Sequence, residues 1–141
     1  MRVTIKNTAI FFFLLFIASY FLPYYSNGDD NLLGFKIWIF NLLGFAFVNS
    51  LSNYIIFLFE NLTVLWVLLL FIQIFKNDSK LMLIIALAIL AITSSCLWYF
   101  QIDDTKGILY GYWIWIVSII GVSACSLLNA RSKQKKNTAT E

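Results

Sequence analysis

GILYGYWIWIVSIIGVSACSLLNA, residues 107–130, is an unbroken stretch without a charged residue, and charged residues flank it on both sides. A helix rises 1.5 Å per residue, so these residues would extend about 36 Å. The hydrocarbon core of a bilayer is about 30 Å thick and needs roughly 20 mostly apolar residues. We therefore predict a membrane-spanning helix over residues 108–129.

Three other stretches have the same character. Residues 7–28 and 81–102 contain no charge, and residues 37–75 contain only Glu60. We predict an all-α integral membrane protein in which residues 1–129 form a single domain, a four-transmembrane-helix bundle. The expected spans are about 5–22, 55–75, 81–100 and 108–129.

The composition excludes several other classes of protein. Hydrophobic residues make up 61% of the chain and charged residues only 12%, which does not suit a soluble domain of this length. Histidine is absent and only two cysteines occur, which argues against a histidine-based catalytic or metal site and against a disulfide scaffold. We expect no cofactor, no metal and no enzymatic activity.

Lysine and arginine set the expected orientation. With four spans, the N-terminus, the 76–80 loop and the C-terminal tail share one side, which holds eight of the ten basic residues. The positive-inside rule then places both termini in the cytoplasm and the protein in the inner (plasma) membrane. The first span has features of a signal peptide, but no small-x-small cleavage site follows it cleanly, and we expect it to be retained.

Residues 37–75 are too long for one span, because a straight helix of this length would extend about 58 Å. A fifth span would move Lys76, Lys80 and the basic tail outside and Asp103 and Asp104 inside, against the charge pattern. We predict instead that residues 35–49 lie in or dip into the outer interface. Whether this segment is helical, extended or re-entrant stays open.

Tryptophan and tyrosine favour the membrane–water interface. The chain has five Trp and seven Tyr residues. On the predicted topology, eleven of these twelve fall near the outer side, and only Trp66 lies mid-membrane. The eleven are Tyr20, Tyr24, Tyr25, Trp38, Tyr54, Trp98, Tyr99, Tyr110, Tyr112, Trp113 and Trp115.

Two interpretations of this aromatic group remain open. It is either an interfacial anchor ring with packing beneath residues 35–49, or a recognition surface for a membrane protein or a lipid. Acidic pairs at Asp29–Asp30 and Asp103–Asp104 would rim such a surface. The candidate interaction residues are Trp38, Trp98, Tyr112, Trp113, Trp115, Asp103 and Asp104.

Glu60 is the one charged residue at membrane depth, where a carboxylate is costly and often marks a function or a partner. Asn53, Asn61 and residues 93–95 offer polar partners at similar depth. Alternatively, Glu60 reaches the headgroups at a frayed helix start. We keep it as a candidate functional residue of an oligomeric transport or channel subunit.

Small residues recur along the last two predicted spans, at Ala88, Ala91 and Ser95 and at Ser118, Gly121, Cys125 and Asn129. Such stripes let helix backbones approach closely, either within a bundle or at the seam of a homo-oligomer. Cys96 and Cys125 are expected near opposite ends of their helices, too far apart for a disulfide, and both as small buried residues.

The segment 130–141 is basic and is expected to be a disordered cytoplasmic tail. Its basic residues beside a span would attract anionic lipid, at about 1 kcal/mol each. A topology anchor explains them, so we expect no nucleic-acid partner. They are Arg131, Lys133, Lys135 and Lys136.

Several short motifs lie at the ends of the predicted spans and in the outer segment. They are Leu22-Pro23, Gly34-Phe35, residues 43–49 and Gly111-Tyr112-Trp113-Ile114-Trp115. With them the chain resembles small four-helix membrane proteins of bacteria, which mostly have no assigned activity and give no catalytic residue to transfer. Immunity proteins against pore-forming bacteriocins are similar in size and topology. Claudin-like tetraspans share the topology, but they carry two cysteines in the first outer loop and this chain has none there.

We therefore predict a non-enzymatic multi-pass inner-membrane protein. It would act by lateral or extracytoplasmic contact with another membrane component, as an immunity or accessory protein. The alternative is an oligomeric transport or channel subunit that uses Glu60.

Overall fold

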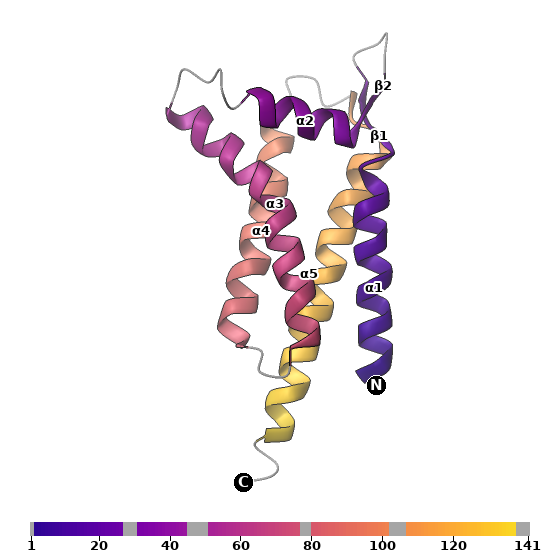
Figure 1. The fold of residues 1–141 in the computed structure, drawn as a ribbon, viewed down its shortest axis with the longest axis vertical. Helices are drawn as coiled ribbons and strands as arrows, with labels where there is room; N and C mark the ends of the chain where they lie inside the picture. Colours follow the sequence, from indigo (N-terminus) through magenta and orange to yellow (C-terminus); the bar gives the residue numbers. More distant parts are fainter. Residues whose placement is uncertain (1, 27–30, 45–50, 77–79, 102–106, 138–141) are drawn as a thin grey trace.

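The structure is a computed structural model that describes residues 2–26, 31–44, 51–76, 80–101 and 107–137 (Figure 1). This part of the chain is mostly helical, as predicted, and also contains one short antiparallel hairpin. The elements are α1 (Arg2–Ser19), β1 (Pro23–Ser26), β2 (Asn31–Leu33), α2 (Gly34–Gly44), α3 (Leu51–Phe75), α4 (Leu81–Gln101) and α5 (Tyr110–Asn137).

Four helices run lengthwise and α2 lies crosswise at one end (Figure 1). The central helix is α5, which packs against α1, α3 and α4, while α3 also packs along α4. We call the end that carries β1, β2 and α2 the hairpin end. The opposite end, with the start of α1 and the last turns of α5, is the tail end.

The first helix begins and ends three residues earlier than predicted, at Arg2–Ser19 instead of 5–22, because the chain turns before Pro23. After Ser19, three successive backbone bonds of the i to i−3 type carry the chain through residues 20–22. The residue before a proline is disfavoured in the α conformation, so the helix stops ahead of it. Pro23 instead opens β1, which pairs antiparallel with β2. This hairpin was not predicted from the sequence.

The hairpin is joined to the start of α5. Tyr25 forms an isolated bridge with Ile108, and the amide of Leu109 donates to the carbonyl of Tyr24 at 2.8 Å. Gly111 is required at this junction, because a Cβ there would lie 2.5 Å from the carbonyl oxygen of Pro23. Backbone contacts therefore join β1 to the start of α5 at the hairpin end.

Only one helix of the described residues is long and apolar enough to cross a membrane by length and composition, over Tyr110–Gln134. Shorter apolar helices cover Thr4–Ser19, Asn61–Phe75 and Leu81–Leu97. The structure thus establishes a helical protein with one candidate span.

The C-terminal segment differs from the prediction. The sequence analysis expected disorder from residue 130, whereas α5 continues to Asn137. The extension is held by side chains: Ser132 donates to the carbonyl of Asn129 at 2.8 Å, and the Lys133 ammonium donates to the carbonyl of Lys76. Contact with the end of α3 stabilises the basic segment as a helix. Composition alone does not predict this contact.

Candidate functional site

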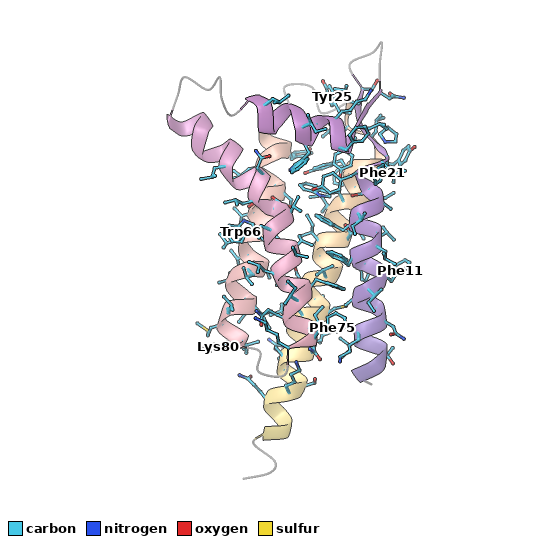
Figure 2. The ribbon with its side chains drawn as sticks, viewed as in Figure 1. Phe11, Phe21, Tyr25, Trp66, Phe75 and Lys80 are labelled. Atoms are coloured by element: carbon cyan, nitrogen blue, oxygen red, sulfur yellow. The ribbon has the colours of Figure 1, made fainter. Side chains whose placement is uncertain are left out.

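Aromatic rings converge at the hairpin end, around three buried side chains. Tyr24, Tyr112 and Trp115 have ring centroids 5.9–6.4 Å apart in each pair. Tyr20 lies 6.3 Å from Tyr24, and Tyr99 lies 6.4 Å from Tyr112. Figure 2 shows the contrast with Trp66, which lies in the middle of the molecule. The predicted gathering of Tyr and Trp at one end is therefore confirmed for these residues.

Hydrogen bonds fix the two tyrosines of this cluster. The hydroxyls of Ser19 and Tyr24 are 3.0 Å apart and share a hydrogen bond. The hydroxyl of Tyr112 donates to the carbonyl of Ser95 at 3.2 Å, which ties α5 to α4. Burial raises the pKa of the Tyr24 phenol, and the Ser19 hydrogen bond opposes that shift. The phenol is neutral and structural at any ordinary pH.

The cluster corrects part of the predicted interaction surface. Tyr112 is 2% exposed and Trp115 is 7% exposed, so neither offers a surface to a partner. Trp38 and Trp113 do, at 37% and 52% exposure. The difference arises because successive residues of a helix point about 100° apart, so that Tyr112 faces the bundle while Trp113 faces away.

Other predicted candidates fall outside the described residues. The side chain of Trp98 is among them, although its backbone belongs to α4. Asp103 and Asp104 lie in the undescribed segment 102–106, and the Asp29–Asp30 pair lies in the segment 27–30. Their predicted role at the rim of a surface stays a prediction.

Glu60 belongs to α3, but its side chain also lies outside the described residues. Two of its expected partners bond within their own helix: Ser94 donates to the carbonyl of Leu90 at 2.6 Å and Ser95 to that of Ile92 at 2.8 Å. The role of Glu60 in transport therefore stays a prediction.

An apolar groove opens beside the aromatic cluster, between the end of α1, the start of α2 and the middle of α3. Its volume is about 290 Å³. Trp38 is the one predicted interaction residue among those that line it. The lining residues are Phe16, Ile17, Tyr20, Phe21, Phe35, Trp38 and Val64.

Gly34 allows α2 to reach this position. A Cβ on Gly34 would lie 2.5 Å from the Tyr24 ring, so the ring can sit directly on the backbone. The amide of Gly34 donates to the carbonyl of Leu22 at 3.1 Å and that of Phe35 to the carbonyl of Tyr20 at 2.8 Å. These contacts bring the Phe35 ring to 6.2 Å from Phe21 across the groove. Figure 2 shows Phe21 at this end of α1.

The groove was not predicted from the sequence. Its walls come from three segments that are separated along the chain, and nothing in their composition indicates that they meet. The available signals were Pro23, which turns the chain, and Gly34, which permits close packing.

The small-residue stripes pack within the bundle, which is one of the two predicted uses; the other was the seam of a homo-oligomer. Ser118 and Cys125 are buried on α5, and a Cβ on Gly121 would lie 2.3 Å from the ring of Phe12 on α1. Ala91 is likewise fully buried on α4. Close approach of α1 to α5 therefore depends on the absence of a side chain at Gly121.

Both cysteines are free thiols. Cys125 is buried as predicted, but Cys96 is exposed, which corrects the expectation that both would be buried. Among the residues that the structure describes, no three His, Cys, Asp or Glu side chains come together as a metal site would require.

Comparisons with protein-family models, with curated proteins and with solved structures find no match to this chain. The resemblance to small bacterial four-helix membrane proteins therefore stays a prediction. The function has to be argued from the distribution of side chains and from the groove.

Proposed function

We propose that this chain is a multi-pass membrane protein whose four lengthwise helices cross the bilayer. It acts without catalysis, through lateral contact of its hairpin end with an apolar segment of another membrane component. Immunity to a membrane-active toxin is one concrete form of such a role.

The observation that carries the proposal is that large apolar side chains are exposed along the helices, while several of the buried side chains are polar. Polar side chains are buried between the helices, among them Thr63, Gln73, Ser94, Ser118, Ser126 and Asn129. Large apolar side chains are exposed on every lengthwise helix, among them Phe11, Leu14, Leu65, Leu68, Leu83, Ile89, Val117 and Ile120.

In water these exposed side chains would form apolar patches far larger than a soluble monomer normally carries. In a bilayer they would contact lipid at no such cost. Buried hydroxyl and amide groups and small residues are then what holds helices together, because lipid removes the hydrophobic drive for their association. The shorter apolar helices, Thr4–Ser19, Asn61–Phe75 and Leu81–Leu97, also expose large apolar side chains.

Charge supports one orientation. The basic side chains of the described residues gather at the tail end, with the exception of Lys36 on α2. Cytoplasmic loops are rich in Lys and Arg, so the tail end would face the cytoplasm and α2 would lie along the outer interface. The tail-end residues are Lys6, Lys76, Lys80, Arg131 and Lys133.

A labelling experiment tests the placement in the membrane. In a variant without Cys96 and Cys125, single cysteines at residues 29 and 104 should react with an impermeant maleimide from outside intact cells. Cysteines at 78 and 135 should react only after the membrane is opened. Labelling of residue 135 from outside would contradict the four-span arrangement.

The groove is the surface that best fits lateral contact, because it is apolar and opens beside exposed aromatic side chains. A Trp38→Ala variant should lose at least tenfold of any partner that co-purifies in mild detergent after cross-linking in native membranes. Trp113→Ala is the matched control, since Trp113 is also an exposed tryptophan but does not line the groove. Equal recovery with both variants would contradict the groove as the contact surface.

A further inference from the structure

The tail end brings together basic side chains from helices that are far apart in sequence. The Nζ of Lys6 on α1 lies 5.5 Å from the centroid of the Phe75 ring, at the end of α3. The Nζ of Lys133 on α5 donates to the backbone carbonyl of Lys76, the next residue. Two ammonium groups from two helices therefore reach the last residue of α3, Phe75, and the residue that follows it, Lys76. Figure 2 shows Phe75 at this end, with Lys80 at the foot of α4.

Lys133 is held in place by the packing of α5. Side chains spaced three and four residues apart share one face of a helix. Three such side chains of α5 donate to carbonyls in the last turns of α3: Ser126 to Leu70, Asn129 to Ile74 and Lys133 to Lys76. Arg131 is two residues from Lys133 and therefore lies about 200° away around the helix.

Apolar surface adjoins this charge. Ile72 and Phe75 are exposed on the last turns of α3, and Lys76 and Lys80 are exposed just beyond them. The acidic residue nearest in sequence is Asp78, which lies outside the described residues. It stands between two basic residues, Lys76 and Lys80. A surface that is cationic at the membrane boundary and apolar below it complements one ligand, an anionic phospholipid.

We propose that the tail end binds the phosphate headgroup of an anionic phospholipid between Lys6 and Lys133, with the acyl chains along Ile72 and Phe75. The inference rests on the proposed placement in the membrane and adds a defined lipid site to it. It differs from the general attraction of a basic tail, because a defined site depends on which face of α5 carries the charge.

The test measures retention of phosphatidylglycerol by the full-length protein, using native mass spectrometry from mild detergent. Phosphatidylcholine with the same acyl chains is the reference lipid. The wild type should retain phosphatidylglycerol at least tenfold better. Lys6→Gln and Lys133→Gln should each lower that retention about 5-fold, because each removes one of the two ammonium groups that would donate charge-assisted hydrogen bonds to the headgroup.

The matched control is Arg131→Gln, which removes the same charge from the opposite face of α5 and should lower retention less than 2-fold. Lys133→Arg should keep retention, because it preserves both the charge and a donor for the Lys76 carbonyl. Equal losses in Arg131→Gln and Lys133→Gln would overturn the defined site, as would equal retention of the two lipids.

A separate measurement distinguishes failure of the site from failure of the proposed function. The protein should resist extraction from vesicles by alkaline carbonate. A chain that is extracted is not embedded, which overturns the membrane proposal and this inference together. A chain that stays embedded but shows no lipid preference overturns the lipid site alone.

Discussion

The two halves of α5 are packed in different ways. Toward the hairpin end, Tyr112 and Trp115 present large rings to their neighbours. At the middle of α5, Gly121 has no side chain, and toward the tail end Ser126 and Asn129 donate directly to backbone carbonyls of α3. Rings fill space between helices that stay apart, whereas small residues let helices touch. The two halves of α5 therefore differ in what holds the helix to its neighbours: ring packing toward the hairpin end, and side-chain hydrogen bonds to the backbone of α3 toward the tail end.

Truncation of a buried side chain should lower the free energy of unfolding most in the hairpin-end half. Trp115→Ala removes a buried indole that contacts Tyr24 and Tyr112. Large-to-small changes of this kind cost about 3–5 kcal/mol. Trp113→Ala, which truncates the exposed neighbour, should cost under about 1 kcal/mol. Unfolding by SDS titration in mixed micelles, followed by circular dichroism, measures both, and equal losses would mean that the rings do not form a core.

The middle of α5, where the small residues begin, should be the more sensitive to added bulk. Gly121→Leu would place side-chain atoms inside the ring of Phe12, since a Cβ alone lies 2.3 Å from it. Overpacking costs about 1–3 kcal/mol. Ala91→Gly, which adds no volume at another buried small residue, serves as a control for helix propensity and should cost about 1 kcal/mol. An unchanged unfolding midpoint in Gly121→Leu would show that α1 does not pack closely on α5.

Two buried serines near the tail end sharpen the comparison further. Ser126 donates to the carbonyls of Leu70 and Val122, whereas the hydroxyl of Ser123 is buried without a partner in the structure. Ser126→Ala should therefore cost about 0.6–1.7 kcal/mol, the range for such bonds between helices in membranes. Ser123→Ala should be neutral or slightly stabilising, because it removes an unsatisfied hydroxyl. The same micelle unfolding assay ranks the pair, and the reverse order would contradict the hydrogen bond from Ser126 on α5 to Leu70 on α3.

A modest loss at neutral pH is expected from Tyr24→Phe, which removes the hydrogen bond with Ser19 and should cost about 0.5–1.5 kcal/mol. Burial raises the pKa of Tyr24 above its ordinary value of 10.0. The unfolded chain then loses its phenolic proton before the folded chain does, so this contribution is fully present below pH 10 and declines as the pH rises above it. Wild type should thus lose more stability than Tyr24→Phe between pH 9 and 11, and parallel pH profiles would contradict the burial.

Part of this architecture could be predicted because it depends on local composition. Apolar runs without charge gave the cores of α1, α3, α4 and α5, and the position of Trp and Tyr along those runs predicted their gathering at one end. The ends of the helices were less accessible. The hairpin after Pro23 and the extension of α5 past Ala130 both depend on contacts with residues distant in sequence.

The candidate site was predicted in kind but not in detail. The sequence indicated that Trp38, Tyr112, Trp113 and Trp115 belong to one aromatic group, yet it could not separate the buried members from the exposed ones. That separation depends on the rotation of α5 about its axis, which is set by its neighbours. No segment considered alone contains this information.

The amino-acid sequence by itself determined the helical character of the chain, the grouping of its aromatic residues and the concentration of basic charge near the tail end. These features follow from which residues adjoin one another along the chain. The tertiary structure decided which rings are buried, how α2 forms one wall of an apolar groove and which lysine side chains contact Phe75 and Lys76. The physical reason is that burial and proximity depend on the relative rotation and spacing of helices, and these are fixed by contacts such as Gly121 on Phe12 and Asn129 on Ile74.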